Sequence, residues 1–182
     1  TLFRSDVIFE DIRVDAVKIG MVSKIESIKA IANALNKVED LCDIVLDPVM
    51  ISKSGFNLLS PDAKETLVKE LFPLATLITP NLPEAEEILG VEIKNLEQMK
   101  DAAKKLIELG PKAVLVKGGH LEDDATDLLY DGNEFVLFPQ ERINTTHTHG
   151  TGCTLSSAIA ANIAKKMNIK DAVGEAKNYI TG

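Results

Sequence analysis

Residues 112–118 read KAVLVKG and form one of four short apolar runs that decide the fold. The other three are residues 15–20 (DAVKIG), 43–49 (DIVLDPV) and 75–80 (ATLITP). Near-continuous apolarity is expected of strands covered on both faces, and longer helical patterns separate the runs. This alternation is typical of βαβ units, so the sequence predicts an α/β fold with a mostly parallel central sheet.

Helices are predicted between these strands. Apolar residues from Ile25 to Val38 recur at three- and four-residue steps, and Ser23 with Glu26 is expected to cap that helix. Ser60 with Pro61 begins a second helix, and Asn95 with Gln98 begins a third that ends near Gly110 and Pro111. The last two helices are expected at residues 151–166 and from residue 170 onward.

Residues 125–139 (ATDLLYDGNEFVLFP) change the pattern, because Asp131, Gly132 and Asn133 separate two short apolar runs. A turn of this composition predicts a β-hairpin that forms an antiparallel edge of the sheet.

The composition limits the possible partners. A chain of 182 residues with 45% apolar content is expected to fold as one domain, residues 1–182. The net charge of −8, without a basic cluster, argues against nucleic acid and anionic membranes. No apolar run approaches the roughly 18 residues of a membrane span. Only two cysteines, Cys42 and Cys153, favour a reducing, cytoplasmic location over a disulfide framework.

Both ends of the chain look cut. It begins with Thr1 and closes inside a helical pattern at residues 176–182 (AKNYITG). Residues 1–5 (TLFRS) match the translation of a common sequencing adapter, so we expect them to be non-native.

The segment 147–154 (HTHGTGCT) leads directly into an apolar helical pattern. Its glycines and the unpaired N–H groups of a helix start predict an anion site, although it lacks the lysine of a Walker A loop. A glycine turn that only lets the helix pack is the alternative.

Cys153 stands at that helix start, which favours the thiolate form and hence a base or nucleophile. A buried, inert cysteine is the alternative, and it is the interpretation we favour for Cys42. A zinc site of His147, His149 and Cys153 is a weaker hypothesis because no fourth ligand lies nearby.

Polar residues follow the predicted strands, where open α/β sheets bind their ligands. Asn81 and Glu84 match a helix capping box and also suit a phosphate or hydrated Mg²⁺. Asp47 ends an apolar strand, so we expect it to meet a cation or hydrogen-bond donors. Lys117 also ends a strand, and its alternative is an amine that simply reaches the solvent.

Taken in order, DAVKIGM, VLDPVM, ITPNLPEAEEILG, VLVKGGH and THTHGTGCTLSSAIAA resemble the hydroxymethylpyrimidine/phosphomethylpyrimidine kinases of thiamine biosynthesis. The resemblance covers nearly the whole chain after residue 5. It implies a ribokinase-like, three-layer α/β/α fold and an ATP- and Mg²⁺-dependent kinase. Its acceptor would be hydroxymethylpyrimidine or its monophosphate.

The resemblance also implies the role of each matching residue. The catalytic group would comprise Cys153 as general base and the anion-hole glycines Gly150 and Gly152. ATP would contact Asn81, Lys117, Gly119, Thr148 and Thr151. The pyrimidine would lie against Gly20, Met21 and Val49, and Mg²⁺ would be organised by Asp47 and Glu84.

Two departures leave alternatives open. The family carries a Gly-rich GSD…GGAG segment before DAVKIGM, and it continues beyond the last helix, so the chain is expected to be a partial domain. Substrate choice depends largely on that segment, which keeps pyridoxal kinase open as an alternative. A nucleotide-binding module without catalysis is the third hypothesis. Relatives are often dimers, so the resemblance also suggests a homodimer.

Overall fold

A computed structural model describes residues 8–51, 57–118, 126–139 and 151–181. Its centre is a six-stranded sheet in the order β1-β2-β3-β4-β5-β6. The first four strands are parallel, and the last two run antiparallel to their neighbours. The strands are β1 (Ala16–Ile19), β2 (Asp43–Leu46), β3 (Leu77–Ile78), β4 (Ala113–Val116), β5 (Asp127–Tyr130) and β6 (Phe135–Phe138).

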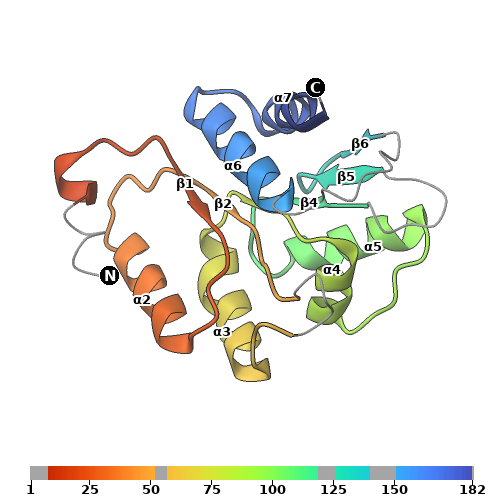
Figure 1. Ribbon diagram of the computed structural model, residues 1–182, viewed down its shortest axis with the longest axis horizontal. Coiled ribbons are helices and arrows are strands. Elements are labelled where there is room, and N and C mark those ends of the chain that lie inside the picture. Colours follow the sequence, from red (N-terminus) through yellow and green to blue (C-terminus); the bar gives the residue numbers. More distant parts are fainter. Residues whose placement is uncertain (1–7, 52–56, 119–125, 140–150, 182) are drawn as a thin grey trace.

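Helices cover both faces of this sheet (Figure 1). One face packs against α2 (Ile25–Leu35), α3 (Pro61–Leu71), α4 (Leu82–Leu89) and α5 (Leu96–Ile107). The other face packs against α6 (Thr151–Ala164) and α7 (Ile169–Thr181). The predicted three-layer α/β/α architecture is therefore confirmed for the described residues.

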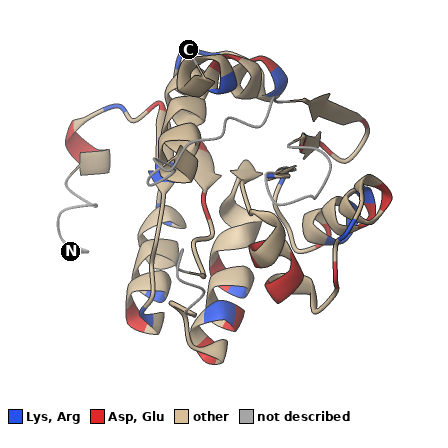
Figure 2. Ribbon diagram, turned by 45° about the vertical axis from the view of Figure 1, so that its right-hand side comes forward, with Lys and Arg blue, Asp and Glu red and all other residues tan. Residues whose placement is uncertain are grey.

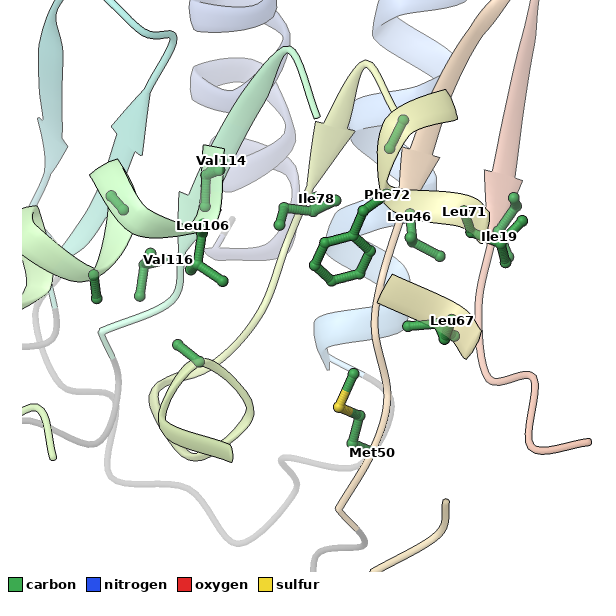
Figure 3. Packing of buried hydrophobic residues seen from close by; sticks show 14 of the residues in the cluster. Ile19, Leu46, Met50, Leu67, Leu71, Phe72, Ile78, Leu106, Val114 and Val116 are labelled. Carbon is green, nitrogen blue, oxygen red and sulfur yellow. The ribbon is translucent and has the colours of Figure 1, made fainter. Parts of the chain in front are cut away.

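Alternation along the strands creates the two cores. Leu46, Ile78 and Val114 point toward the α2–α5 layer, where Phe72 of the short 3₁₀ helix Phe72–Leu74 lies beside Leu46 and Ile78 (Figure 3). Their neighbours Val45 and Leu77 face α6 and α7 instead. All five side chains are essentially inaccessible to water. Burial on both faces explains why the strands read as continuous apolar runs rather than alternating ones.

Most predicted helix starts are confirmed, and one is wrong. The Ser60 side chain accepts from Ala63 N–H, and the Asn95 side chain accepts from Gln98 N–H, as expected of N-caps. The Ser23 capping box does not form. Helix α2 begins one residue later, so Lys24 takes the N-cap position without a side-chain hydrogen bond. A one-residue shift removes Ser23 and Glu26 from the positions that a capping box requires.

Helix ends differ slightly from the predicted ones. Helix α2 ends at Leu35, and the chain reaches Val38 through a turn in which Val38 N–H donates to Leu35 O. Helix α5 ends at Ile107, three residues before Gly110. Gly110 has a φ of 114°, and a Cβ there would lie 2.9 Å from Pro73 Cα, so this turn requires glycine.

The hairpin prediction is confirmed. Strands β5 and β6 pair in an antiparallel register, and they lie at the β6 edge of the sheet. The Asp131 side chain accepts hydrogen bonds from the N–H groups of Asn133 and Glu134. These bonds lower the pKa of the Asp131 carboxyl, because they stabilise its charged form.

Acidic and basic positions are interspersed along the helices rather than gathered into one basic stretch (Figure 2). Among the described residues, none of the helices combines the length and the apolar character that crossing a membrane requires.

Candidate active site

An ion pair between Lys117 and Asp47 lies at the carboxyl end of the parallel strands. The Lys117 ammonium is 3.0 Å from Asp47 Oδ1, with side chains that are 17% and 2% exposed. Thr79, which follows β3, donates its hydroxyl to the same Asp47 oxygen at 3.1 Å. Asp47 thus meets both a cation and a donor, as predicted. The pairing also excludes the alternative in which Lys117 simply reaches the solvent.

The first turn of α6 approaches this ion pair. A Cβ on Gly152 would lie 3.1 Å from Lys117 Nζ, so glycine leaves space here for the ammonium group. Ser156, one turn later, is fully buried and has its Oγ 3.4 Å from Asp47 Oδ2. Helix α6 therefore places its N-terminal N–H groups and the positive end of its dipole beside Lys117.

The start of α4 also lies beside the Lys117–Asp47 pair. The Asn81 side chain accepts from Glu84 N–H at 2.8 Å, and Glu84 Oε2 accepts from Asn81 N–H at 2.9 Å. The predicted capping box is therefore confirmed. Asn81 also forms an isolated parallel bridge with Lys117, which ties the start of α4 to the end of β4.

Glu84 connects this cap to the segment after β2. It is 3% exposed, and its Oε1 lies 3.4 Å from Met50 N–H. Burial raises the pKa of the Glu84 carboxyl, and the positive charge of Lys117 opposes that rise. The negative charge of Asp47 raises the Glu84 pKa further, so the two carboxylates lie near enough to influence each other.

Two neighbouring carboxylates fit Mg²⁺, which usually takes one or two protein carboxylates together with water and substrate phosphates. Within the described parts of the chain, Asp47 and Glu84 have no third acidic, histidine or cysteine partner grouped with them. Both carboxylates already accept hydrogen bonds from the protein. They therefore suit a hydrated ion better than a fully protein-coordinated one.

The residues predicted to border the acceptor lie at the same edge of the sheet. Gly20 and Met21 follow β1, and Asp47 N–H donates to Ile19 O, which places the segment after β2 beside them. Met21 is 55% exposed, and Val49 is half-buried. These apolar groups are accessible from outside, as the wall of a substrate pocket must be.

Cys153 follows Gly152 in the first turn of α6, and it is exposed. The alternative of a buried, inert residue is therefore wrong for Cys153. Cys42 is half-buried rather than fully buried. Burial raises the pKa of the Cys42 thiol, which favours its protonated, unreactive form.

Thr151 begins α6, so the predicted site residues Thr151, Gly152 and Cys153 all lie in its first turn. Gly119, Thr148 and Gly150 lie outside the described residues. The same holds for His147 and His149 of the zinc hypothesis.

The sequence marked Thr79 only as one of the polar residues that follow a predicted strand, without a role, and Ser156 was not singled out. Both are fully buried, and each has its hydroxyl oxygen within 3.4 Å of an Asp47 oxygen. The signal for Thr79 was its position immediately after an apolar strand. The signal for Ser156 was a polar residue on the buried side of an otherwise apolar helix.

Comparison with known proteins shows what the chain is similar to. A family model described as phosphomethylpyrimidine kinase matches residues 4–182. A hydroxymethylpyrimidine/phosphomethylpyrimidine kinase of Rhizobium meliloti is 49% identical over 177 residues, covering 96% of this chain and 66% of the relative. The chain spans 36% of the length of a similar bifunctional thiamine biosynthesis protein and about two thirds of that of single kinases.

Two solved structures resemble the fold closely. The crystal structure of phosphomethylpyrimidine kinase from Clostridium difficile has a TM-score of 0.88 at 48% identity, covering 99% of this chain and 73% of the other. An ADP complex of Bacillus subtilis pyridoxal kinase has a TM-score of 0.90 at 40% identity, with coverages of 98% and 68%.

Proposed function

Because the chain belongs to the phosphomethylpyrimidine kinase family, we propose that its protein transfers the γ-phosphoryl group of ATP to a hydroxymethylpyrimidine. The acceptors are 4-amino-5-hydroxymethyl-2-methylpyrimidine and its monophosphate, and the products serve thiamine biosynthesis. The observation that carries the proposal is the convergence of Lys117, Asp47 and Gly152 at the start of α6.

In the first proposed reaction, the pyrimidine hydroxyl oxygen attacks the γ-phosphorus, and the bond from that phosphorus to the bridging oxygen of ADP breaks. In the second reaction, an oxygen of the monophosphate group is the attacking atom. Cys153 accepts the hydroxyl proton, since its sulfur is exposed at the helix start. General-base assistance of this kind is worth about 10²- to 10⁴-fold in rate. The thiol later returns the proton to solvent.

The remaining residues hold charge in place, which is most of what phosphoryl transfer requires. Lys117 and the α6 N–H groups would bind the phosphate oxygens, and Asn81, Gly119 and the 148–152 segment would complete the ATP contacts. Bound Mg²⁺ would neutralise phosphate charge. Asp47 and Glu84 would hold its water ligands, and Gly20, Met21 and Val49 would border the pyrimidine ring.

Lys117 has to change partners for this mechanism to work. Asp47 neutralises the ammonium at 3.0 Å. In this proposal, the same ammonium would turn toward a phosphate bound beside Gly152, and Asp47 would then be free to hold the water ligands of Mg²⁺. The 17% exposure of Lys117 is consistent with a side chain that can move between the two.

The proposal includes a cytoplasmic homodimer, because the sequence has only two cysteines and the family resemblance suggests a dimer. Sedimentation of the purified protein tests the dimer directly. A monomer at all concentrations used in the assay would remove that part of the proposal.

Product analysis tests the function. The intact protein that carries this chain is incubated with ATP, Mg²⁺ and one acceptor at a time, and products are identified by mass. We expect the mono- and diphosphate of the pyrimidine. Absence of both products, with an enzyme that binds ATP, would contradict the proposed acceptor.

Pyridoxal kinase is the second candidate, and the TM-score of 0.90 with the Bacillus subtilis pyridoxal kinase favours keeping it. Pyridoxal also presents a hydroxymethyl group on a small aromatic ring. The same assay with pyridoxal therefore ranks the acceptors by kcat/KM, and we expect the pyrimidine to be preferred.

A further inference from the structure

A second buried lysine–aspartate pair lies next to the strand end that carries Lys117. Asp127 is the first residue of β5, and Leu128 is paired with Val116, so antiparallel pairing places Asp127 at the carboxyl end of β4. Lys177 reaches it from α7, with its ammonium 2.5 Å from Asp127 Oδ2. The two side chains are only 6% and 9% exposed.

Asp127 uses its other oxygen to hold the backbone beside Lys117. Its Oδ1 accepts a hydrogen bond from Gly118 N–H at 2.8 Å. On the other side, Lys117 N–H donates to Pro80 O, also at 2.8 Å. The N–H groups on both sides of the Lys117 α-carbon are therefore fixed. Fixing them orients the side chain that pairs with Asp47.

Gly118 makes this contact possible. A Cβ at this position would lie 1.8 Å from Thr126 O, a distance that no side chain tolerates. The chain after β4 therefore lies directly against the chain that enters β5. That close approach brings the Gly118 amide within reach of Asp127.

The charges in this pair need an explanation beyond packing. Burying two charges costs desolvation energy, and apolar residues of similar volume often stabilise a protein equally well or better. Apolar residues at 127 and 177 would keep α7 against the sheet. They would also leave the buried Gly118 N–H without an acceptor, which is unfavourable. The carboxylate supplies that acceptor, and Lys177 neutralises the carboxylate.

We propose that Asp127 is a positioning residue for Lys117 and that Lys177 of α7 holds Asp127 in place. Figure 1 shows α7 beside α6 above the β4–β6 side of the sheet, and the Lys177–Asp127 contact links α7 to the strand end that carries Lys117. This inference rests on the proposed function, because Lys117 is assigned there to the phosphates of ATP.

Two double variants of the intact protein separate this role from simple stabilisation. Asp127→Asn with Lys177→Met removes both charges and keeps an acceptor for Gly118 N–H. Asp127→Leu with Lys177→Met removes the same charges and also the acceptor. Because Asn and Leu have nearly the same shape, the acceptor is the main difference between the two proteins. Calorimetry gives the Kd for ATP, steady-state assays give KM and kcat, and melting curves report folding.

The Asp127→Asn, Lys177→Met variant (the Asn double variant) is expected to keep a Kd for ATP close to that of the wild type. The Leu double is expected to bind ATP about 10- to 100-fold more weakly, the size of effect that a misplaced site residue produces. The KM for the pyrimidine should stay the same in both. If the Leu side chain distorts the loop, Asp127→Ala in the same background removes the acceptor without adding volume, and the same weakening is expected.

Equal Kd values for ATP in the Asn and Leu doubles would overturn the positioning role. The positioning role would also be overturned if the Leu and Ala double variants failed to fold while the Asn double variant folded. The Asp127 carboxylate would then serve stability alone. A wild-type protein that binds no ATP would instead contradict the proposed function, and this inference with it. A wild type that binds ATP without phosphorylating the pyrimidine contradicts only the acceptor assignment.

Discussion

The two buried lysine–aspartate pairs at the carboxyl end of the sheet differ in one respect. Lys117 of the first pair is 17% exposed and lies beside Gly152, whereas Lys177 of the second pair is 6% exposed and lies on the buried side of α7. We propose that the more exposed Lys117 exchanges its carboxylate for a ligand and that the buried Lys177 helps to fix the backbone. In this proposal, the same pair of residue types binds a ligand in one place and supports the backbone in the other.

Lys117→Met gives the largest effect on activity expected from either pair. Removing a cation that faces the transferred phosphoryl group should lower kcat/KM by about 10²- to 10³-fold. Steady-state kinetics measures this loss. Lys112→Met is the matched control, because Lys112 is exposed and stands before the other end of the same strand. Similar losses in both variants would mean that the site has been placed at the wrong end of the sheet.

Lys177→Met should lower stability more than activity, the opposite of what we expect for Lys117→Met. It leaves Asp127 buried without its cation, which costs about 3–5 kcal/mol in the free energy of unfolding. Because Asp127 still accepts from Gly118 N–H, kcat/KM should fall less than for Lys117→Met. Denaturant unfolding measures the stability.

Lys170→Met on the same helix is the control for this loss. The ion pair between Lys170 and Glu134 is long, with 4.0 Å between Nζ and Oε1, and the Lys170 side chain is 57% exposed. We expect a change of less than about 0.5 kcal/mol. Equal losses for Lys170→Met and Lys177→Met would remove the distinction between the two kinds of pair.

How much of this arrangement the sequence could predict depends on how local each contact is. The Asn81–Glu84 cap spans three residues and leaves a readable pattern, and the strand ends were visible because each apolar run stops at a polar residue. The Ser23 cap has an equally readable pattern and still does not form, because α2 begins one residue later.

The Lys177–Asp127 pair was not predicted. Its residues are 50 positions apart, and neither belongs to a motif. The only trace was a lysine one residue after Ala176 on the buried side of α7. Such a lysine normally reaches the solvent along the helix, so its partner becomes visible only when β5 is placed beside β4.

Gly152→Ala tests whether the Lys117–Asp47 pair lies at the phosphate site. The added Cβ lies 3.1 Å from Lys117 Nζ, so the ammonium must move by a few tenths of an ångström. We expect the KM for ATP to rise several-fold. Stability should hold or improve, since Ala is favoured over Gly in a helix by up to about 1 kcal/mol.

Gly174→Ala in α7 is the control for this variant, because its Cβ would make only an ordinary 3.7 Å contact with Phe138. It should gain similar stability and leave the KM for ATP unchanged. A KM for ATP that also stays constant in Gly152→Ala would place the phosphates away from the start of α6.

Glu84→Gln should change the pH dependence of stability, which is the smallest effect. The pKa of Glu84 is raised in the folded protein, so above pH 4.5 the folded state holds a proton that the unfolded chain has lost. The free energy of unfolding therefore falls as the pH rises from 4.5 to the folded pKa, and the loss is constant above it.

Stability curves against pH for wild type and Glu84→Gln test this sign. As the pH rises above 4.5, the free energy of unfolding of the wild type should fall relative to that of Glu84→Gln. Glu65→Gln on the exposed side of α3 is the control and should run parallel to the wild type. A difference that shifts in favour of the wild type over the same range would show that Glu84 is stabilised as a carboxylate.

The rate of phosphoryl transfer from ATP to hydroxymethylpyrimidine in the Cys153→Ala variant tests the central claim most directly, since it joins the exposed thiol to the phosphate site at the start of α6. We predict a loss of about 10²- to 10⁴-fold in kcat, with the Kd for ATP and the stability kept, and no loss for Cys42→Ala. An unchanged kcat in Cys153→Ala would contradict the assignment of this helix start as the catalytic centre.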